Sequence, residues 1–373
     1  MFNFVLNKRP WMPCVLIAGI STAVLPLEAP APAYAAFDYN IEQIAPAVAS
    51  QLTMADIAAI LNETVNNPSS WEVFQLATTD ARGHQVSVAP LKVVQTDSTV
   101  CPYIGVYHNQ INTTQFATYL GCSSDLATWS QVGQIHSPAS QPDIRILSDG
   151  SALYAEEYSA GRPVVRMHYY GNVPGKTGLQ TLIANPAVVP TNTFTAPQTI
   201  LATTDGTPEF GRITYTGSIL SSTVEVTHHF YDQLTSPRRD LQGVATLTNG
   251  KTWSNSRDTT MNNTITNAGG TGKIGDREVF KVGSTVYEVV EAQIGPAGNY
   301  YDTWRLFLVN KTTSTAQQLN PLLAGGAKSL GNPTLTFVTL PNGKPALVFT
   351  YFIFSVNNGT TPPGGHIYVY PLR

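Results

Sequence analysis

A short sequence motif repeats along this chain, and carboxylate residues recur at one position of it; we call this motif the repeated phrase. Asp143 follows Pro142, and Glu209 follows Pro208. Two carboxylates that face each other across a pocket can act as general acid and as base or nucleophile, which is what glycoside hydrolysis requires. Clustered carboxylates also raise one another's pKa, so that one can stay protonated near neutral pH. Asp143 and Glu209 are therefore candidate catalytic residues; the alternative is that they accept hydrogen bonds from buried strand amides.

Other polar residues occupy the same region in the remaining copies of the phrase, although the first copy has only Ala89 and Leu91 there. Arginines follow one to three residues further along, and a guanidinium can either screen carboxylates or bind an anionic sugar. We predict that substrate is bound by these residues: Arg145, Arg212, Asp276, Arg277, Glu278 and Asn332.

The histidines do not indicate a metal site. His108, His136 and His168 are scattered without the spacing of metal ligands. His228 and His229 are neighbours in a predicted strand, so they point to opposite faces. The sequence contains no nucleophile elbow, phosphate-binding loop or dinucleotide-binding glycine motif. We therefore predict no metal and no cofactor.

The elements that position these residues are strands that recur along the chain. Five copies of the phrase align on Pro90, Pro142, Pro208, Arg277 and Pro333, at intervals of 52 to 69 residues. Each copy continues into β-favouring residues, and the second passes through Asp149-Gly150, which predicts a two-residue type I′ turn. Strands repeated at this period predict the blades of a β-propeller.

The two ends of the repeat indicate how the ring closes. Only 40 residues follow Pro333, which is short for a blade, whereas the predicted strand at 71–76 has no partner near the first copy. We expect this strand to complete the last sheet, because closure leaves no sheet edge open. The predicted fold class is all-β: a five-bladed β-propeller over residues 69–373.

Two other segments precede the propeller. Residues 1–35 have the basic, apolar and small-residue regions of a signal peptide, with Ala33-Tyr34-Ala35 before the cleavage point; the alternative is an uncleaved membrane anchor. Residues 36–68 form a helical lead-in, in which Thr53 and Asp56 resemble a capping pair and Asn66-Asn67-Pro68 ends the helix. We expect this helix to pack outside the propeller or over one of its mouths.

Composition and cysteines limit the cellular setting and the partners. After signal removal Cys101 and Cys122 remain, and an even pair in an exported chain predicts a disulfide rather than two buried thiols. Only 12% of residues are charged and the net charge is −3, so there is no basic footprint for nucleic acid. We expect a secreted monomer, extracellular or periplasmic, with a carbohydrate ligand and no membrane span once the signal is removed.

The turn Ser123-x-Asp125-Leu126-x-x-Trp129, followed by Pro142-Asp143-Ile144 and by Asp149-Gly150-x-x-Leu153-Tyr154, resembles the five-bladed propeller glycosidases, the clan of arabinanases, xylosidases and fructosidases. The spacing of the repeats resembles that of the family from Pro90 to the C-terminus. The sequence motifs themselves resemble those of the family in blades one and two. It implies a glycoside hydrolase with an axial substrate pocket.

The chain departs from that family at its catalytic motifs. The family places its catalytic base as Asp directly before the first repeated proline, where this chain has Ala89. The family's general acid lies in a Glu-Gly-Pro phrase, whereas here the order is Pro208-Glu209. Two hypotheses follow: a glycoside hydrolase, or a non-catalytic propeller that binds glycan or a protein partner. Carboxylates buried against Arg145 or Arg212 would favour the second.

Overall fold

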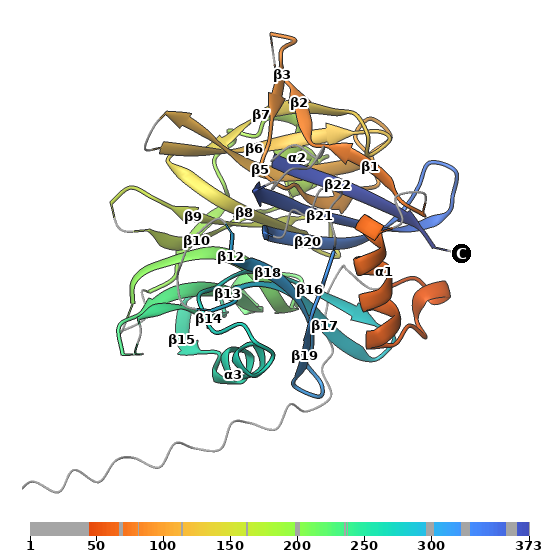
Figure 1. The fold of residues 1–373 in the computed structure, drawn as a ribbon. Coiled ribbons are helices and arrows are strands. Elements are labelled where there is room, and N and C mark those ends of the chain that lie inside the picture. Colours follow the sequence, from red (N-terminus) through yellow and green to blue (C-terminus); the bar gives the residue numbers. More distant parts are fainter. Residues whose placement is uncertain are drawn as a thin grey trace, which may run out of the picture. The chain divides into compact units, whose positions relative to one another are not determined.

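The computed structural model describes residues 45–66, 70–80, 82–112, 115–161, 163–197, 202–234, 236, 238–295, 302–321, 329–355 and 364–372. The predicted signal peptide lies outside these residues. The described strands form five antiparallel blades, which follow one another through yellow, green and blue in Figure 1.

Four blades are built from four consecutive strands each. Blade one comprises β4 (Lys92–Gln95), β5 (Tyr103–Asn112), β6 (Gln115–Ser123) and β7 (Trp129–His136). Blade two comprises β8 (Ala139–Ile146), β9 (Ala152–Tyr158), β10 (Val164–Tyr170) and β11 (Asn192–Thr195). Blade three comprises β12 (Ala202–Thr214), β13 (Thr223–Asp232), β14 (Arg239–Thr248) and β15 (Thr252–Arg257). Blade four comprises β16 (Ile274–Val282), β17 (Thr285–Gln293), β18 (Trp304–Asn310) and β19 (Thr315–Gln318).

Blade five joins the two ends of the repeat. Its strands β20 (Ser329–Thr339), β21 (Pro345–Ser355) and β22 (Gly364–Pro371) are completed by β1 (Glu72–Gln75), which pairs with β22 from Glu72 opposite Val369 to Gln75 opposite His366. The inner strands β4, β8, β12, β16 and β20 contact one another in a closed cycle. The predicted five-bladed propeller and its closing strand are therefore confirmed.

Blade one is extended by two short strands. In it β2 (Ala77–Thr79) pairs in parallel with β7, and β3 (Gln85–Ser87) pairs with β2. Each of the five clusters of buried apolar side chains among the described residues is built mainly from two neighbouring blades. Burial of apolar area between blades therefore holds the ring together.

The repeated prolines mark a bulge in the inner strands. The ladder of β8 shifts between Ser140 and Asp143, and equivalent shifts occur in β12, β16 and β20. A proline has no N–H for the ladder, so the pairing is interrupted beside it in β8, β12 and β20. In β16 the same shift occurs at Gly275 and Asp276, without a proline. The residue before the proline has positive φ in three blades: 48° at Gln141, 44° at Thr207 and 48° at Asn332.

The predicted helical lead-in contains α1 (Met54–Asn66) and the short 3-10 helix Ala47–Ala49. Thr53 and Asp56 exchange hydrogen bonds at the start of α1, as a capping pair does. Ile57 and Leu61 are buried against apolar side chains of blades four and five, so α1 packs on the outside of the propeller.

Two further α-helices lie between strands of the propeller. The helix α2 (Gly178–Ala184) begins with a capping box made by Thr177 and Gln180. In α3 (Thr259–Asn267), the side chain of Asp258 caps the first turn, and Met261 and Ile265 are buried. No helix among the described residues is long and apolar enough to cross a membrane.

The predicted disulfide is confirmed, since Cys101 and Cys122 are bonded with their Cα atoms 5.5 Å apart. The predicted type I′ turn is wrong. The strands around it end at Ile146 and resume at Ala152, and of the two central residues only Gly150 has positive φ. The loop is longer because two backbone hydrogen bonds close it. The Leu147 N–H donates to the Ser151 carbonyl, and the Gly150 N–H donates to the Leu147 carbonyl.

Candidate functional site

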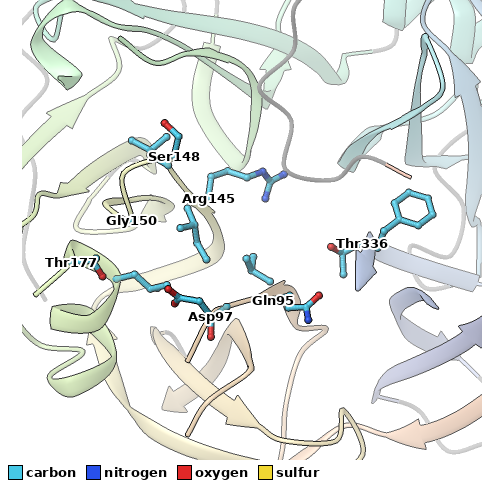
Figure 2. A pocket seen from close by; sticks show the side chains of 13 residues that line it. Gln95, Asp97, Arg145, Ser148, Gly150, Thr177 and Thr336 are labelled. Carbon is cyan, nitrogen blue, oxygen red and sulfur yellow. The ribbon is translucent and has the colours of Figure 1, made fainter. Parts of the chain in front are cut away.

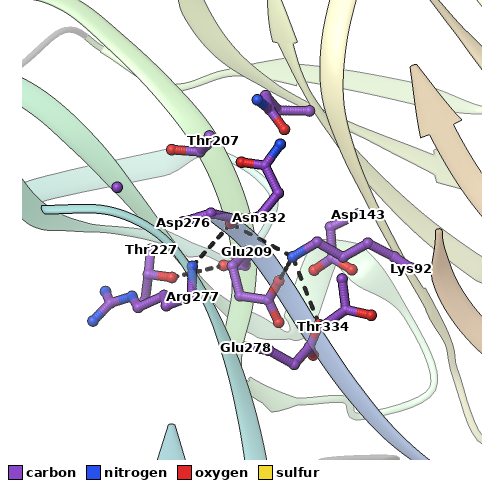
Figure 3. A network of polar contacts seen from close by, with 12 residues as sticks. Lys92, Asp143, Thr207, Glu209, Thr227, Asp276, Arg277, Glu278, Asn332 and Thr334 are labelled. Atoms are coloured by element: carbon purple, nitrogen blue, oxygen red, sulfur yellow. Dashed lines mark hydrogen bonds and ion pairs between the residues drawn. The ribbon is translucent and has the colours of Figure 1, made fainter. Parts of the chain in front are cut away.

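A network of buried charges fills the axis of the propeller. Its members come from the inner strands of four blades: Lys92 of β4, Asp143 and Arg145 of β8, Glu209 of β12, and Asp276 and Glu278 of β16. All six are buried, and Asp143 and Glu209 are 0% exposed. Figure 3 shows the side chains of Lys92, Asp143, Glu209, Asp276 and Glu278 converging between the strands.

The two cations of the network are shared among the carboxylates. Arg145 lies 2.7 Å from Asp143 and 2.9 Å from Glu278, and it also pairs with Glu209. Lys92 pairs with Glu209 and lies 3.7 Å from Asp276. Asp143 also accepts hydrogen bonds from the N–H groups of Ile144 and Phe210, so this carboxylate ties blade two to blade three.

Four carboxyl groups surround only two cations, so some of them retain a proton. Burial raises the pKa of Asp143 and of Asp276 to about 6, and that of Glu209 to about 7. Burial acts against the charge of Lys92, but the surrounding carboxylates outweigh it and hold the Lys92 pKa well above its ordinary value. At pH 7 Asp143 and Asp276 are therefore mainly ionised, whereas Glu209 is close to half protonated.

The other predicted arginines lie outside this network. Arg277 is buried, and its guanidinium lies 3.1 Å from Asp258 and 3.4 Å from Glu288. Its guanidinium also donates to the Gly243 carbonyl at 3.4 Å, so Arg277 is directed toward blade three and not toward the network. Arg212 is half-buried, unlike the six buried members of the network.

A pocket of about 510 Å³ opens where the inner strands end, and we call it the turn-side pocket. It is lined by polar residues such as Gln95, Asp97 and Ser148, with Phe337 and Leu147 beside them, and Arg145 reaches it from the network. Figure 2 shows these side chains around an open centre.

A larger pocket of about 680 Å³ opens where the inner strands begin, and we call it the proline-side pocket. Every blade contributes the residue before the proline or its equivalent: Ala89, Gln141, Thr207, Gly275 and Asn332. In blade four the bulge lies at Gly275 and Asp276, so the fourth copy aligns on Asp276 and not on Arg277 as predicted. The second strands contribute His108, His229, Glu291 and Phe352. His229 and Phe352 pair with the residue just before the bulge, whereas Glu291 lies opposite the bulge of β16. Trp304, Phe354 and Phe116 add aromatic surface. Of the residues predicted to bind substrate, Asn332 is the one that lines this pocket.

Each strained residue before a proline donates its N–H to the preceding blade. Gln141 donates to His108 at 3.3 Å, and Thr207 donates to Glu157 at 3.3 Å. Asn332 donates to Glu291, whose other oxygen accepts the Asp276 N–H at 2.9 Å. These bonds hold the positive φ values in place, since an isolated non-glycine residue rarely adopts them.

Glu291 is the carboxyl group that the sequence analysis missed. It lines the proline-side pocket with about 5% of its surface exposed, and burial raises its pKa to about 8. The predicted site residues all lie on the inner strands, near the repeated prolines, whereas Glu291 lies on β17, the second strand of blade four. The available signal was that the second strand of a hairpin presents residues to the same mouth as the beginning of the first.

No protein-family model matches the chain, and no curated protein matches it in sequence. Solved structures match it in fold. One described as a glycoside hydrolase has a TM-score of 0.54 at 11% identity, over 87% of this chain and 96% of its own. A complex of BT0996 with RGII has a TM-score of 0.53 at 11% identity, with the same coverage. The resemblance to propeller glycoside hydrolases is therefore confirmed as a likeness of fold.

Proposed function

We propose that this protein binds carbohydrate in the proline-side pocket. A sugar needs flat apolar surface for its ring faces and a few placed polar groups for its hydroxyls. The pocket combines the aromatic rings of Trp304, Phe352 and Phe354 with the side-chain amides of Gln141 and Asn332. Phe352 and Phe354 pack with ring centroids 5.3 Å apart, which supports one aromatic wall.

Backbone strain supports the same location. Gln141, Thr207 and Asn332 hold positive φ at the floor of this pocket, and Thr207 is β-branched, which makes that conformation costly. Strained residues gather at ligand-binding sites, where surrounding contacts over-determine them. Here the hydrogen bonds that their N–H groups donate to His108, Glu157 and Glu291 supply those contacts.

The single observation that favours binding over hydrolysis is the floor residue Ala89. By the family resemblance, the catalytic base would be an aspartate at this position, and Ala89 lines the pocket instead. The predicted catalytic pair is Asp143 and Glu209, which lie below the pocket, buried and ion-paired to Arg145. A group that acts on a substrate must come within hydrogen-bond reach of it.

Hydrolysis remains the second candidate, on one specific observation. Glu291 and Asp240 both line the proline-side pocket, and burial keeps Glu291 protonated near neutral pH, as a general acid requires. Asp240 pairs with Lys273 at 2.9 Å. In this candidate Glu291 donates a proton to the leaving group and Asp240 acts as base.

The test screens the purified chain against oligosaccharides from arabinan, xylan, galactan, fructan and mannan, with binding read by calorimetry and hydrolysis by release of reducing ends. We expect binding that Phe352→Ala weakens and that Ser148→Ala, in the turn-side pocket, leaves unchanged. Turnover abolished by Glu291→Gln would support the second candidate. Turnover abolished by Asp143→Asn with Glu209→Gln, in a variant that still folds, would support the catalytic pair predicted from sequence. The absence of any glycan binding would contradict the proposal.

We also propose that the chain is exported, with residues 1–35 as its signal. The Cys101–Cys122 disulfide supports this, because such bonds persist in oxidising compartments. Fusion of residues 1–35 to a reporter that is active only after export tests it directly.

A further inference from the structure

Three residues with metal-binding side chains meet between blades one and two, away from both pockets. His136 ends β7 of blade one, whereas Glu156 and His168 come from β9 and β10 of blade two. Glu156 lies opposite Arg166 and His168 lies opposite Tyr154 in the ladder, so Glu156 and His168 share one face of the sheet. The imidazole rings of His136 and His168 lie 4.4 Å apart across the junction.

The donor atoms of these residues are already close to a coordination geometry. One atom from each residue can be chosen so that all three lie within 4.8 Å of one another. Glu156 lies 2.9 Å from His136 Nδ1 and 3.2 Å from His168 Nε2. Ligands on a tetrahedral zinc ion, with bonds of roughly 2.0–2.1 Å, lie about 3.4 Å apart. Small side-chain movements would therefore suffice to admit an ion.

The surroundings of the cluster match those of a metal site. His168 Nδ1 lies 3.0 Å from the Thr193 hydroxyl, which fixes the ring with Nε2 toward Glu156. Metal-bound histidines usually hold their second nitrogen in this way. The hydroxyl of the buried Tyr170 has no hydrogen-bond partner among the described residues, and that of Tyr154 lies beside Thr118 and Glu156. They provide polar groups for a metal-bound water.

We propose that His136, Glu156 and His168 bind one divalent transition-metal ion of the zinc class, with a fourth position left for water. Two imidazoles and one carboxylate suit zinc and its neighbours, whereas Ca²⁺ and Mg²⁺ prefer an all-oxygen shell. The side chain of His136 is 24% exposed, so the ion can reach the cluster from solvent. Because the ligands come from two blades, the ion links blade one to blade two.

The test uses the full-length protein, purified without a histidine tag, stripped with a chelator and titrated with ZnCl₂ against a chelating dye. We expect one zinc ion per molecule, a thermal midpoint that rises with zinc concentration, and visible absorption when CoCl₂ replaces zinc. Glu156→Gln and His168→Ala should weaken zinc binding by more than the roughly 10- to 100-fold that Thr193→Val costs through its outer-shell contact.

His84→Ala is the matched control, because this exposed histidine lies outside the cluster and should leave zinc affinity unchanged. If a buried variant fails to fold, His136→Asn changes the most accessible ligand and gives the same comparison. Zinc that binds the folded wild type and His136→Asn equally, or that binds neither, would overturn the proposal and leave the cluster a hydrogen-bonded link from one blade to the next.

Discussion

The axial charge network and the proline-side pocket are built from the same repeated phrase, yet they differ in character. Residues after the prolines, such as Asp143 and Glu209, are fully buried and neutralised by Lys92 and Arg145. Residues before the prolines, such as Gln141 and Asn332, line an open pocket and hold strained backbone. In blades two, three and five, the bulge at the proline therefore separates the buried network from the residues that line the pocket.

Removing a cation from the network should have the largest effect. Arg145→Met leaves three carboxylates with Lys92 as their only nearby cation, and we expect a loss of about 3–5 kcal/mol in the free energy of unfolding. Urea unfolding measures it. Arg212→Met, in the inner strand of blade three but outside the network, should cost about 1 kcal/mol or less. Equal losses for the two variants would remove the structural distinction between network and surroundings.

Removing an aromatic ring from the proline-side pocket should reduce glycan affinity without touching the network. For Phe352→Ala we expect affinity to fall at least tenfold, or about 1.4 kcal/mol, because the half-buried ring forms one wall. Phe337→Ala, which alters the turn-side pocket, is the aromatic control. A larger fall for Phe337→Ala would move the ligand to the other mouth.

The raised carboxyl pKa values predict a stability that falls with rising pH. The folded chain retains protons on Glu209 and Glu291 up to about pH 7 and 8, whereas the unfolded chain releases them near pH 4.5. The free energy of unfolding should therefore decrease between pH 6.5 and 8.5, by at most about 1.4 kcal/mol per pH unit for each proton. Buried neutral His108 and His228, whose lowered pKa values act in the opposite sense, affect only lower pH.

Urea unfolding at several pH values measures this slope. Glu291→Gln should reduce it, whatever its effect on stability at a single pH. Stability that is constant or rises over this range would mean that the two carboxyl groups are ionised in the folded chain.

The smallest expected effect is a difference in stability between two variants of Asn332. Comparing them distinguishes the contribution of the strained backbone from that of the side-chain amide at the pocket floor. Asn332→Gly and Asn332→Ala remove the same amide, but alanine must hold the φ of 48° that glycine adopts freely. We expect Asn332→Ala to be less stable than Asn332→Gly by about 1 kcal/mol. Both should lose glycan affinity equally, and an affinity loss in only one variant would assign binding to the backbone rather than to the amide.

The sequence allowed the scaffold to be predicted because each of its signals is local. The prolines mark inner strands, the unpaired strand at 71–76 implies closure, and Cys101 and Cys122 flank one hairpin. Which residues face the axis could not be predicted in this way. A bulge inserts one residue and exchanges the two faces of a strand, so positions beside Pro142 divide between network and pocket.

The histidine cluster was missed for a different reason. His136, Glu156 and His168 come from three strands in two blades, so no spacing within one element indicates their meeting. Glu291 was missed for a similar reason, because its position at the pocket depends on the register of β17 against β16. Such sites become visible only when the packing between sheets is known.

The pairing of β1 with β22 affects how the protein can fold. Because β1 and β22 come from opposite ends of the chain and share one sheet, the propeller cannot close until β22 has been synthesised. Contacts this distant in sequence form slowly, and unpaired strand edges invite association between molecules in the meantime. A variant that lacks β22 should therefore accumulate as aggregates rather than as a stable four-bladed remnant.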